Sequence, residues 1–444
     1  MTHRAPDSLR RQAVRAAGLG MFLDGFDISI MAIALLPLRG DWHLGPGAIG
    51  NLMASALIGS FVGALIGGPL VDRFGRRALL LPNVVLYALG AGASAASLGL
   101  LSLWFGRFCV GLAVGMDYPL VATVVAEYSG DQRRGHGFGW INFAWYAGAL
   151  GSTLIGLALL PLGALSWRFM LGAAILPALV LLWLRRQIPE SPRWLMRRGD
   201  ETAAQEAIAR LHPDWAPAQR AHALDGYRGT RQPLSVLLHG RWRKRLVLSL
   251  IPWFCLDVVG LGIGLYFPVV LRMQGLVHDN VAASAINAAF LVLSAAGIAL
   301  AITRLDRWGR IPLQITGFVA MTLGLLVFAW GLVGHAPSWV FAGAAIYSLG
   351  TGVGPGVTAM ALAVEIFPTE LRASAGGLAT AFSRLGAVLS ALVFPRLQAS
   401  LGLASVLILM GGVTLVGAWI TFLYPLEPAR LSLEALEDPG AHGL

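Results

Sequence analysis

The chain has 444 residues, of which 56% are hydrophobic and only 13% are charged. A soluble globular domain carries about 25% charged residues, and a disordered chain combines low hydrophobicity with high net charge, so both classes are excluded. The formal net charge of +10 does not indicate nucleic-acid binding, because the basic residues separate apolar segments instead of lining one soluble face. The composition predicts a polytopic membrane protein.

Apolar segments long enough to cross a bilayer recur along the chain, since a spanning helix needs about 20 mostly apolar residues. We predict twelve, over residues 17–38, 47–71, 77–98, 101–126, 138–160, 165–184, 245–271, 283–303, 311–333, 337–363, 373–397 and 401–424. The shorter alternating segments of a membrane β-barrel are missing. The first helix follows a polar start without a convincing cleavage site, so we expect it to be retained. The expected fold class is an all-α polytopic membrane protein with twelve transmembrane helices.

The basic residues predict the orientation in the membrane. Nearly all of the 33 Lys and Arg residues lie in the N-terminal segment, in the loops after even-numbered helices or in the C-terminal tail. An excess of basic residues marks the cytoplasmic side, so we expect both termini to be cytoplasmic. The exceptions are Arg39, Arg168, Arg272 and Arg396 near outer helix ends, and Arg107 and Arg384 within helices.

A long polar segment, 185–244, divides the chain into two halves. We expect an N-terminal six-helix bundle over 1–184, a cytoplasmic linker over 185–244, a C-terminal six-helix bundle over 245–426 and a tail over 427–444. Within the linker, Thr202, Glu206 and Arg210 recur every four residues, which predicts the polar face of a short amphipathic helix.

Two charged motifs occur once in each half. Asp-Arg-x-Gly-Arg stands at 72–76 and again at 306–310, after the second and the eighth predicted helix. A glutamate and an arginine seven residues apart follow the fourth helix, as Glu127 and Arg134, and the tenth, as Glu365 and Arg372. Internal repeats are typical of transporters, and these acids and arginines are placed to form a charge network between helix ends.

The repeated motifs resemble those of the major facilitator superfamily over essentially the whole chain. Pro189–Leu195 and Glu365–Arg372 further resemble the sugar-porter branch. The resemblance implies two pseudo-symmetric six-helix bundles and a cytoplasmic network that latches the outward-open state, with simple topology anchoring as the alternative. Its members here would be Asp72, Arg73, Arg76, Glu127, Arg134, Asp306, Arg307, Arg310, Glu365 and Arg372.

Some ionisable residues fall inside the predicted spans, where they are energetically expensive and by default functional candidates. Asp24 and Asp27 are three residues apart and share one helix face. Arg107 and Asp117 are ten residues apart, about 15 Å along a helix axis, so they need partners on other helices. The candidates for proton coupling are Asp24, Asp27, Arg107, Asp117 and Asp257, and Arg384 is a second arginine at membrane depth.

Asp27 and Arg107 form the leading candidate pair. Desolvation favours a neutral carboxylic acid, whereas a nearby arginine favours the carboxylate, so such a pair can act as a proton switch. The resemblance agrees, because proton-coupled sugar porters use an Asp on the first helix with an Arg in a Gly-Arg-x-x-x-Gly context, which is Gly106–Gly111 here. The alternative is a static structural ion pair.

Three further motifs narrow the branch. Asp24–Asp27 resembles the first-helix motif of aromatic-acid and phosphate proton symporters and of their organic-ion relatives. Gly115–Leu120, followed by Glu127 and Tyr128, resembles the fourth helix of phosphate:proton symporters, and Trp253–Asp257 resembles their seventh helix. In that family these Asp, Tyr and Trp positions line the substrate and proton site.

The departures from the phosphate family concern its hydrogen-bonding groups. Leu261 stands where a Tyr is expected, Trp145 where a Gln is expected, with Asn142 as the nearest amide, Gly356 where an Asn is expected, and Arg384 replaces a Lys. Phosphate recognition favours dense hydrogen-bond donors. We therefore expect a larger ligand with both apolar and anionic parts.

Arg384 suits an anionic ligand, because a guanidinium binds a carboxylate bidentately and stays charged. Aromatic residues could supply apolar walls, although packing explains each of them equally well. Arg384 could instead pair with Asp257, and the substrate would then compete with Asp257 for Arg384. The candidate substrate site comprises Tyr118, Asn142, Trp145, Trp253, Asp257, Tyr266, Tyr347 and Arg384, with Tyr146 as a further stacking face.

The favoured function is proton-coupled symport of a small organic anion, an aromatic or other monocarboxylate such as a nicotinate-type acid, by alternating access. A neutral sugar, inorganic phosphate and an organic cation remain alternatives. A sugar is disfavoured because the Gln-Gln pair typical of the seventh helix of sugar porters is missing, whereas a cation is favoured by the four Asp at membrane depth.

Other functional classes lack their sequence signals. A P-loop, a His–Glu metal motif and a nucleophile elbow are missing, so we expect no enzyme, no catalytic residues, no cofactor and no metal. A transporter-like receptor would need a long soluble domain. The expected partners are a small-molecule substrate, protons and the lipid bilayer, with no nucleic acid, for a functional monomer in a bacterial inner (plasma) membrane.

Overall fold

A computed structural model describes residues 5–128, 134–186, 188–211, 215–225, 234–367 and 369–428, although some side chains within these ranges are not described. All regular elements in these ranges are helical. The N-terminal half contains α1 (Ala5–Trp42), α2 (Pro46–Phe74), α3 (Arg77–Ala95), α4 (Leu100–Tyr128), α5 (Arg134–Leu159), η2 (Leu160–Leu165), α6 (Ser166–Ala173) and α7 (Ile175–Arg185).

The linker and the C-terminal half follow. The linker contains α8 (Pro192–Arg197), α9 (Glu201–Leu211), α10 (Pro217–Asp225) and η4 (Leu234–Leu238). The C-terminal half contains α11 (Gly240–Met273), α12 (Asn280–Trp308), α13 (Arg310–Val333), α14 (Pro337–Val353), α15 (Pro355–Glu365), α16 (Thr369–Leu401) and α17 (Leu403–Leu423).

The apolar helices confirm a multi-pass membrane protein. Eleven stretches in the described residues are long and apolar enough to span a bilayer, and one of them, Trp140–Arg185, has 46 residues. That stretch turns back at η2, where Gly163 has a left-handed φ of 70°, so it crosses twice. The described residues therefore provide helices for the twelve predicted crossings.

Two predicted helices are interrupted. The 165–184 segment is divided into α6 and α7, and the 337–363 segment into α14 and α15. Between α14 and α15, Gly354 leaves helical geometry with φ −112° and ψ −108°, and Pro355 supplies no backbone N–H to continue the hydrogen-bond ladder. Hydropathy detects only the apolar part of a helix. It therefore does not predict that α1 and α11 extend beyond the predicted bounds into polar residues.

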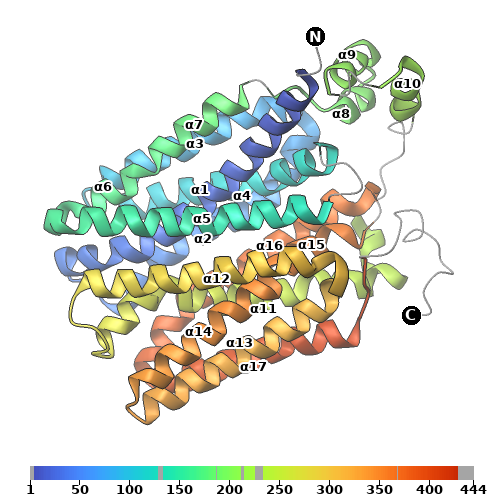
Figure 1. Ribbon diagram of the computed structural model, residues 1–444. Helices are drawn as coiled ribbons and strands as arrows, with labels where there is room; N and C mark the ends of the chain where they lie inside the picture. Colours follow the sequence, from blue (N-terminus) through green and yellow to red (C-terminus); the bar gives the residue numbers. More distant parts are fainter. Residues whose placement is uncertain are drawn as a thin grey trace.

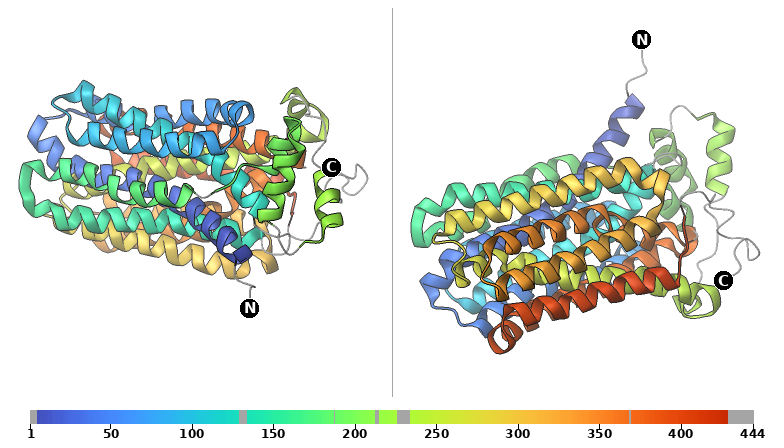
Figure 2. Two further views of the ribbon diagram at one scale, coloured as in Figure 1. Left: turned by 90° about the horizontal axis from the view of Figure 1, so that it is seen from above. Right: turned by 60° about the horizontal axis from the view of Figure 1, so that its bottom comes forward.

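The two halves pack side by side along their length. In Figure 1 the N-terminal helices lie above the C-terminal helices, and α12 runs beside α5. Further contacts between the halves join α2 to α16 and α1 to α11. The linker helices α8–α10 lie at one end of the bundle, which we call the linker end, and α1 begins and α17 ends there as well (Figure 2).

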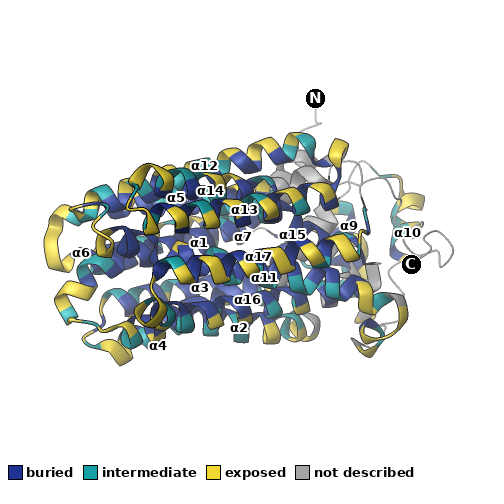
Figure 3. Ribbon diagram, turned by 90° about the horizontal axis from the view of Figure 1, so that it is seen from below, coloured by how far each residue is buried: buried dark blue, intermediate teal, exposed yellow. Residues whose placement is uncertain are grey.

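The outer surface of the bundle is apolar. Exposed residues follow the outward faces of the helices (Figure 3), and many are large hydrophobic side chains, including Leu89, Trp183, Trp330 and Phe422. A continuous apolar surface of this extent fits contact with lipid. In the linker the pattern is the opposite, because Thr202, Glu206 and Arg210 are exposed on α9 while Ala204 and Ile208 are buried, as the four-residue spacing predicts.

Glycines allow α2 and α4 to approach closely. A β-carbon at Gly111 on α4 would overlap the carbonyl oxygen of Ala56 on α2, and Gly115 is equally close to α2 one turn later. Gly59 and Gly63 on α2 face the α4 backbone in the same way. Small residues at helix interfaces bring backbones together in membranes, and this contact sets the position of α4, which carries Arg107, Asp117 and Tyr118.

We predict that Gly111→Ala lowers the melting temperature of the purified protein, because overfilling a packed contact costs about 1–3 kcal/mol. Gly412→Ala is the matched control, since a β-carbon there meets no atom within 4 Å and Ala favours the helix by about 0.5–1 kcal/mol. Thermal unfolding in detergent compares the two, and equal melting temperatures would contradict the packing interpretation.

Candidate functional site

A cavity of about 190 Å³ lies between the two halves. Its walls come from α1, α4 and α5 on one side and from α11 to α16 on the other. That volume suits a small molecule and not a peptide. The predicted residues that line it are Tyr118, Asn142, Trp145, Tyr146, Trp253, Asp257, Tyr347 and Arg384.

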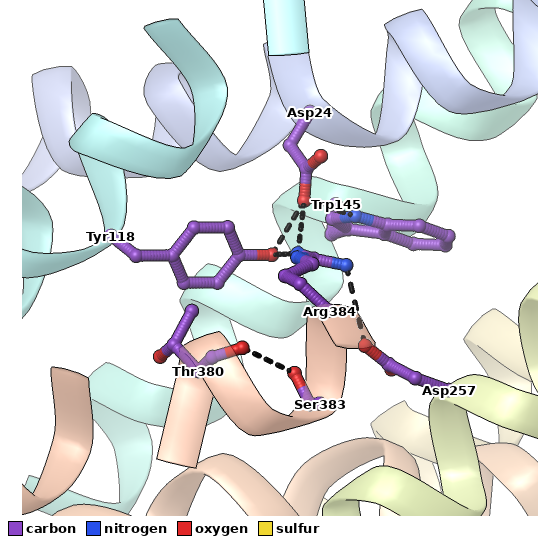
Figure 4. Close-up of polar contacts among 7 residues, drawn as sticks. All are labelled: Asp24, Tyr118, Trp145, Asp257, Thr380, Ser383 and Arg384. Carbon is purple, nitrogen blue, oxygen red and sulfur yellow. Dashed lines mark hydrogen bonds and ion pairs between the residues drawn. The ribbon is translucent and has the colours of Figure 1, made fainter. Parts of the chain in front are cut away.

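Arg384 on α16 stands at the centre of a charged cluster (Figure 4). One of its terminal nitrogens lies 3.4 Å from Oδ2 of Asp257 on α11, and the other lies 3.2 Å from Oδ2 of Asp24 on α1. That second nitrogen also contacts the Tyr118 hydroxyl, and the guanidinium carbon lies 4.7 Å from the centre of the Tyr118 ring. Arg384 thus pairs with Asp257, the alternative that the sequence analysis considered, and it has Asp24 as an additional partner.

Asp24 is held by groups from three other helices. Its Oδ2 accepts hydrogen bonds from the Tyr118 hydroxyl on α4 at 2.5 Å and from the Trp145 indole on α5 at 2.9 Å, besides Arg384. Asp24 and Arg384 belong to different halves and are 360 residues apart in sequence. The cluster therefore ties the two bundles together at the cavity.

Asp27 and Arg107 form a separate buried pair within the N-terminal half. The two terminal nitrogens of Arg107 lie 2.5 Å and 2.7 Å from the two carboxylate oxygens of Asp27, a bidentate arrangement. Both side chains are at most 4% exposed, and neither residue lines the cavity. The structure thus brings together the pair that the sequence predicts, beside the substrate cavity instead of in its wall.

Asp117 has a partner that sequence reasoning missed. Arg185, the last residue of α7, places a terminal nitrogen 2.5 Å from Asp117 Oδ1, and Asn83 on α3 donates to the same oxygen at 3.1 Å. Arg185 is 3% exposed, so it is not a solvated linker residue. Its position at the end of an apolar segment made it look like an orientation signal, and only the packing of α7 against α3 and α1 reveals its burial.

Tyr266 is the one predicted substrate residue that does not line the cavity. Its hydroxyl donates to the Ala391 carbonyl at 2.8 Å, and its ring stacks on Phe394 with centroids 5.2 Å apart. Nine residues separate it from Asp257, which is about two and a half helical turns. The two side chains therefore leave opposite faces of α11, and Tyr266 packs against α16.

Sequence reasoning also missed part of the cavity wall that the C-terminal half supplies. This part of the wall combines Phe290 and Phe328 with the polar side chains of Asn287, Ser294 and Ser348. Single Asn and Ser residues are too common in apolar helices to be singled out. The cavity wall thus combines the charged side chains of Arg384 and Asp257 with mainly apolar residues and scattered hydrogen-bonding groups.

At the linker end, Arg310 and Glu365 form a bidentate ion pair. Arg310 Nε lies 2.9 Å from Glu365 Oε2, and a terminal nitrogen donates to Oε1 at 3.2 Å. Arg310 also donates to the Leu305 carbonyl at 3.3 Å. The pair joins the start of α13 to the end of α15, as expected for a charge network between helix ends.

The repeated turns at 75 and 309 are capped by glutamates from distant segments. Glu190 accepts hydrogen bonds from the backbone N–H groups of Arg76 and Arg77, each at 3.0 Å, and Glu427 accepts from the N–H of Ile311 at 2.8 Å. Gly75 and Gly309 have left-handed φ values of 83° and 89°, and a β-carbon at either would overlap the capping glutamate. The pseudo-symmetry therefore extends to these caps, which the sequence did not reveal.

The other predicted members of the network are placed as follows. Arg76 is buried, whereas Arg73 and Arg307 are exposed. The side chains of Asp72, Glu127, Arg134, Asp306 and Arg372 lie outside the described set.

Comparison with known proteins agrees with this architecture. The sequence matches the family described as sugar (and other) transporter over residues 14–438. The inner membrane metabolite transport protein YgcS of Escherichia coli (strain K12) is 29% identical, with 94% of this chain and 91% of that protein covered. The arabinose-proton symporter of Bacillus subtilis (strain 168) is 28% identical, with 83% and 81% covered. The solved structure of the proton:xylose symporter XylE with 6-bromo-6-deoxy-D-glucose has 25% sequence identity and a TM-score of 0.83, covering 97% of this chain and 99% of that one.

Two six-helix halves around a shared cavity define the class, a transporter with the major facilitator superfamily fold. More narrowly, the chain belongs to the sugar (and other) transporter family. The predicted fold class and the superfamily resemblance are confirmed, and the family is one of transporters and not of enzymes.

We predict that Glu365→Gln speeds the conformational cycle and lowers the melting temperature without changing substrate affinity. The amide keeps the shape but removes the charge that holds Arg310, and a hydrogen bond to a charged group contributes about 1.5–3 kcal/mol. Stopped-flow uptake into proteoliposomes measures the rate. Glu206→Gln on the exposed face of α9 is the matched control, and a changed affinity with an unchanged rate would contradict a latch.

Proposed function

We propose that this transporter is a proton-coupled symporter of a small organic anion, an aromatic or other monocarboxylate, that works by alternating access. The observation that carries the proposal is Arg384, a permanently charged guanidinium in the cavity wall. Trp145, Trp253 and Tyr347 line the same cavity and provide flat apolar surfaces for the body of such a ligand. An anion with an apolar body matches both the charged and the apolar residues of the cavity wall.

Proton coupling is assigned to the Asp27–Arg107 pair. The pair is bidentate and buried. Separating the Asp27 carboxylate from Arg107 is therefore energetically costly unless Asp27 is protonated. Protonation of Asp27 would release Arg107 and permit α1 and α4 to move apart, whereas deprotonation would lock them together. Relatives named as an arabinose-proton symporter and a proton:xylose symporter support coupling to protons.

A sugar is the second candidate substrate. It is favoured by those same named relatives and by the uncharged hydrogen-bonding groups of the cavity, among them Asn142, Asn287 and Ser348. A neutral sugar does not require the charge of Arg384, so the response of binding to changes at this residue separates the two candidates. Phosphate and an organic cation rank lower, because the cavity combines one arginine and one aspartate with mostly apolar walls.

The remaining assignments follow from the same function. We propose a bacterial inner membrane location with both termini in the cytoplasm, two bundles at 1–184 and 245–426, and a functional monomer. On this orientation the linker end is cytoplasmic, and the repeated acid–arginine network latches it when the cavity is open to the outside.

We predict that Arg384→Gln weakens binding of benzoate and nicotinate at least about 10-fold, since hydrogen bonds to charged groups contribute about 1.5–3 kcal/mol, and leaves D-xylose and D-glucose binding less affected. Arg384→Lys should restore part of the anion binding, because it keeps the charge but loses the fork geometry. Quenching of tryptophan fluorescence reports binding. Unchanged carboxylate affinity in Arg384→Gln would reject the anion site.

We predict that Asp27→Asn abolishes proton-driven accumulation while leaving exchange of substrate across the membrane. The amide cannot release a proton, so the pair no longer cycles between its two states. Proteoliposomes with an imposed pH gradient measure accumulation, and counterflow without a gradient measures exchange. Uphill uptake by the variant at the wild-type level would remove Asp27 from the coupling mechanism.

A further inference from the structure

The cluster at Arg384 is unbalanced in charge. It holds two carboxylates, Asp24 and Asp257, but a single guanidinium, which stays protonated. The other two aspartates at membrane depth each have their own arginine, Arg107 for Asp27 and Arg185 for Asp117. The excess acid of the described transmembrane pairs is therefore located at the substrate cavity.

The two carboxylates are held differently. Asp24 accepts three hydrogen bonds at one oxygen and does not line the cavity. Asp257 meets Arg384 at the longer distance of 3.4 Å, lines the cavity and is 11% exposed. A ligand that enters the cavity contacts Asp257 directly, whereas it reaches Asp24 only through Arg384, Tyr118 and Trp145, the three groups that donate to Asp24 and line the cavity.

Few other ionisable groups face Asp257. Arg384 comes from α16, Asp24 from α1, Tyr118 from α4 and Tyr146 from α5, and Tyr347 of α14 also lines the cavity. The parts of α12, α13 and α15 that line the cavity contribute only uncharged, non-titrating residues, and the sequence of α17 has no ionisable side chain. Asp257 is thus the carboxylate of the cluster that a substrate and solvent protons can both reach.

With Asp24 and Asp257 both ionised against one guanidinium, the cluster has one excess negative charge, and an anion that enters the site adds a second. Adding an uncompensated charge to a site of low dielectric constant is energetically unfavourable. Entry of one anion together with one proton leaves the total charge of the site unchanged. The charge balance therefore favours binding of the two as a unit.

We propose that the substrate carboxylate replaces Asp257 as the partner of Arg384, and that Asp257 then takes up one proton. The ion pair between Arg384 and Asp257 breaks, an ion pair between Arg384 and the substrate forms, and the freed Asp257 carboxylate takes up a proton that the buffered solvent supplies as hydronium. Release reverses each step, so one proton accompanies each anion. This exchange rests on the proposed function, since it requires an anionic substrate, and it is separate from the switch at Asp27 and Arg107.

Isothermal titration calorimetry on the purified full-length protein tests the exchange. Benzoate and nicotinate are titrated in buffers of different ionisation enthalpy, and benzamide and nicotinamide serve as neutral probes. We expect one proton to be taken up per carboxylate bound. Because the bound state holds one more proton than the free state, affinity rises as the pH falls and drops by about tenfold per unit of increasing pH.

Variants identify the proton acceptor. Asp257→Asn should bind the carboxylates without proton uptake and without the tenfold pH slope, whereas Asp24→Asn should keep both. Asp279→Asn is the matched control, because Asp279 caps α12 through the Ala282 N–H away from the cavity and Asn is an equally good cap. It should behave as the wild type. The wild-type titrations need no variant, so the test survives if Asp257→Asn does not fold.

The outcomes separate the two proposals. Carboxylate binding without proton uptake, or uptake that persists in Asp257→Asn and is lost in Asp24→Asn, would overturn the exchange while leaving the anion substrate in place. Failure of both carboxylates to bind at any pH, with sugar binding intact, would overturn the proposed function and the exchange together.

Discussion

Burial of charge in a bilayer is the constraint on which this structure depends. A charged side chain at the centre of a membrane costs about 2.5–3.5 kcal/mol even by insertion measurements, and an unpaired one is costlier still in a dry protein interior. All four aspartates at membrane depth accordingly meet an arginine on another helix. The helices cannot separate at these points unless a proton or another ion takes over a charge.

Some of these ion pairs lie within one half of the molecule, and one joins the two halves. Asp27 with Arg107, and Asp117 with Arg185, act within the N-terminal bundle. Arg384 instead connects α16 to Asp24 on α1, across the boundary between the bundles, and does so in the wall of the cavity. The same side chain therefore lines the cavity and joins the two bundles.

Charged side chains also form specific contacts at the linker end, where charges are less costly than in the transmembrane part. Arg310 and Glu365 join helix ends directly, while Glu190 and Glu427 reach back from segments after each bundle to cap the repeated turns. Backbone N–H groups at a helix start have no intrahelical partner, so a carboxylate there satisfies donors and favours the positive end of the helix dipole. In each half, the segment that follows the last helix thus contacts the repeated turn of the same half.

Much of this could be predicted from the chain alone, because hydropathy and the cost of buried charge act locally. The low charge content predicted a membrane protein, and the apolar segments predicted twelve crossings. Asp27 and Asp257 were candidates because they lie inside these apolar segments. Tertiary structure decided which charges meet. Only the packing of the helices reveals that Arg185 is buried against Asp117, that Asp24 reaches an arginine 360 residues away, and that Tyr266 faces away from the cavity. Contacts of this kind depend on the rotation and crossing of helices that the sequence does not encode locally, so pairing follows from three-dimensional packing alone.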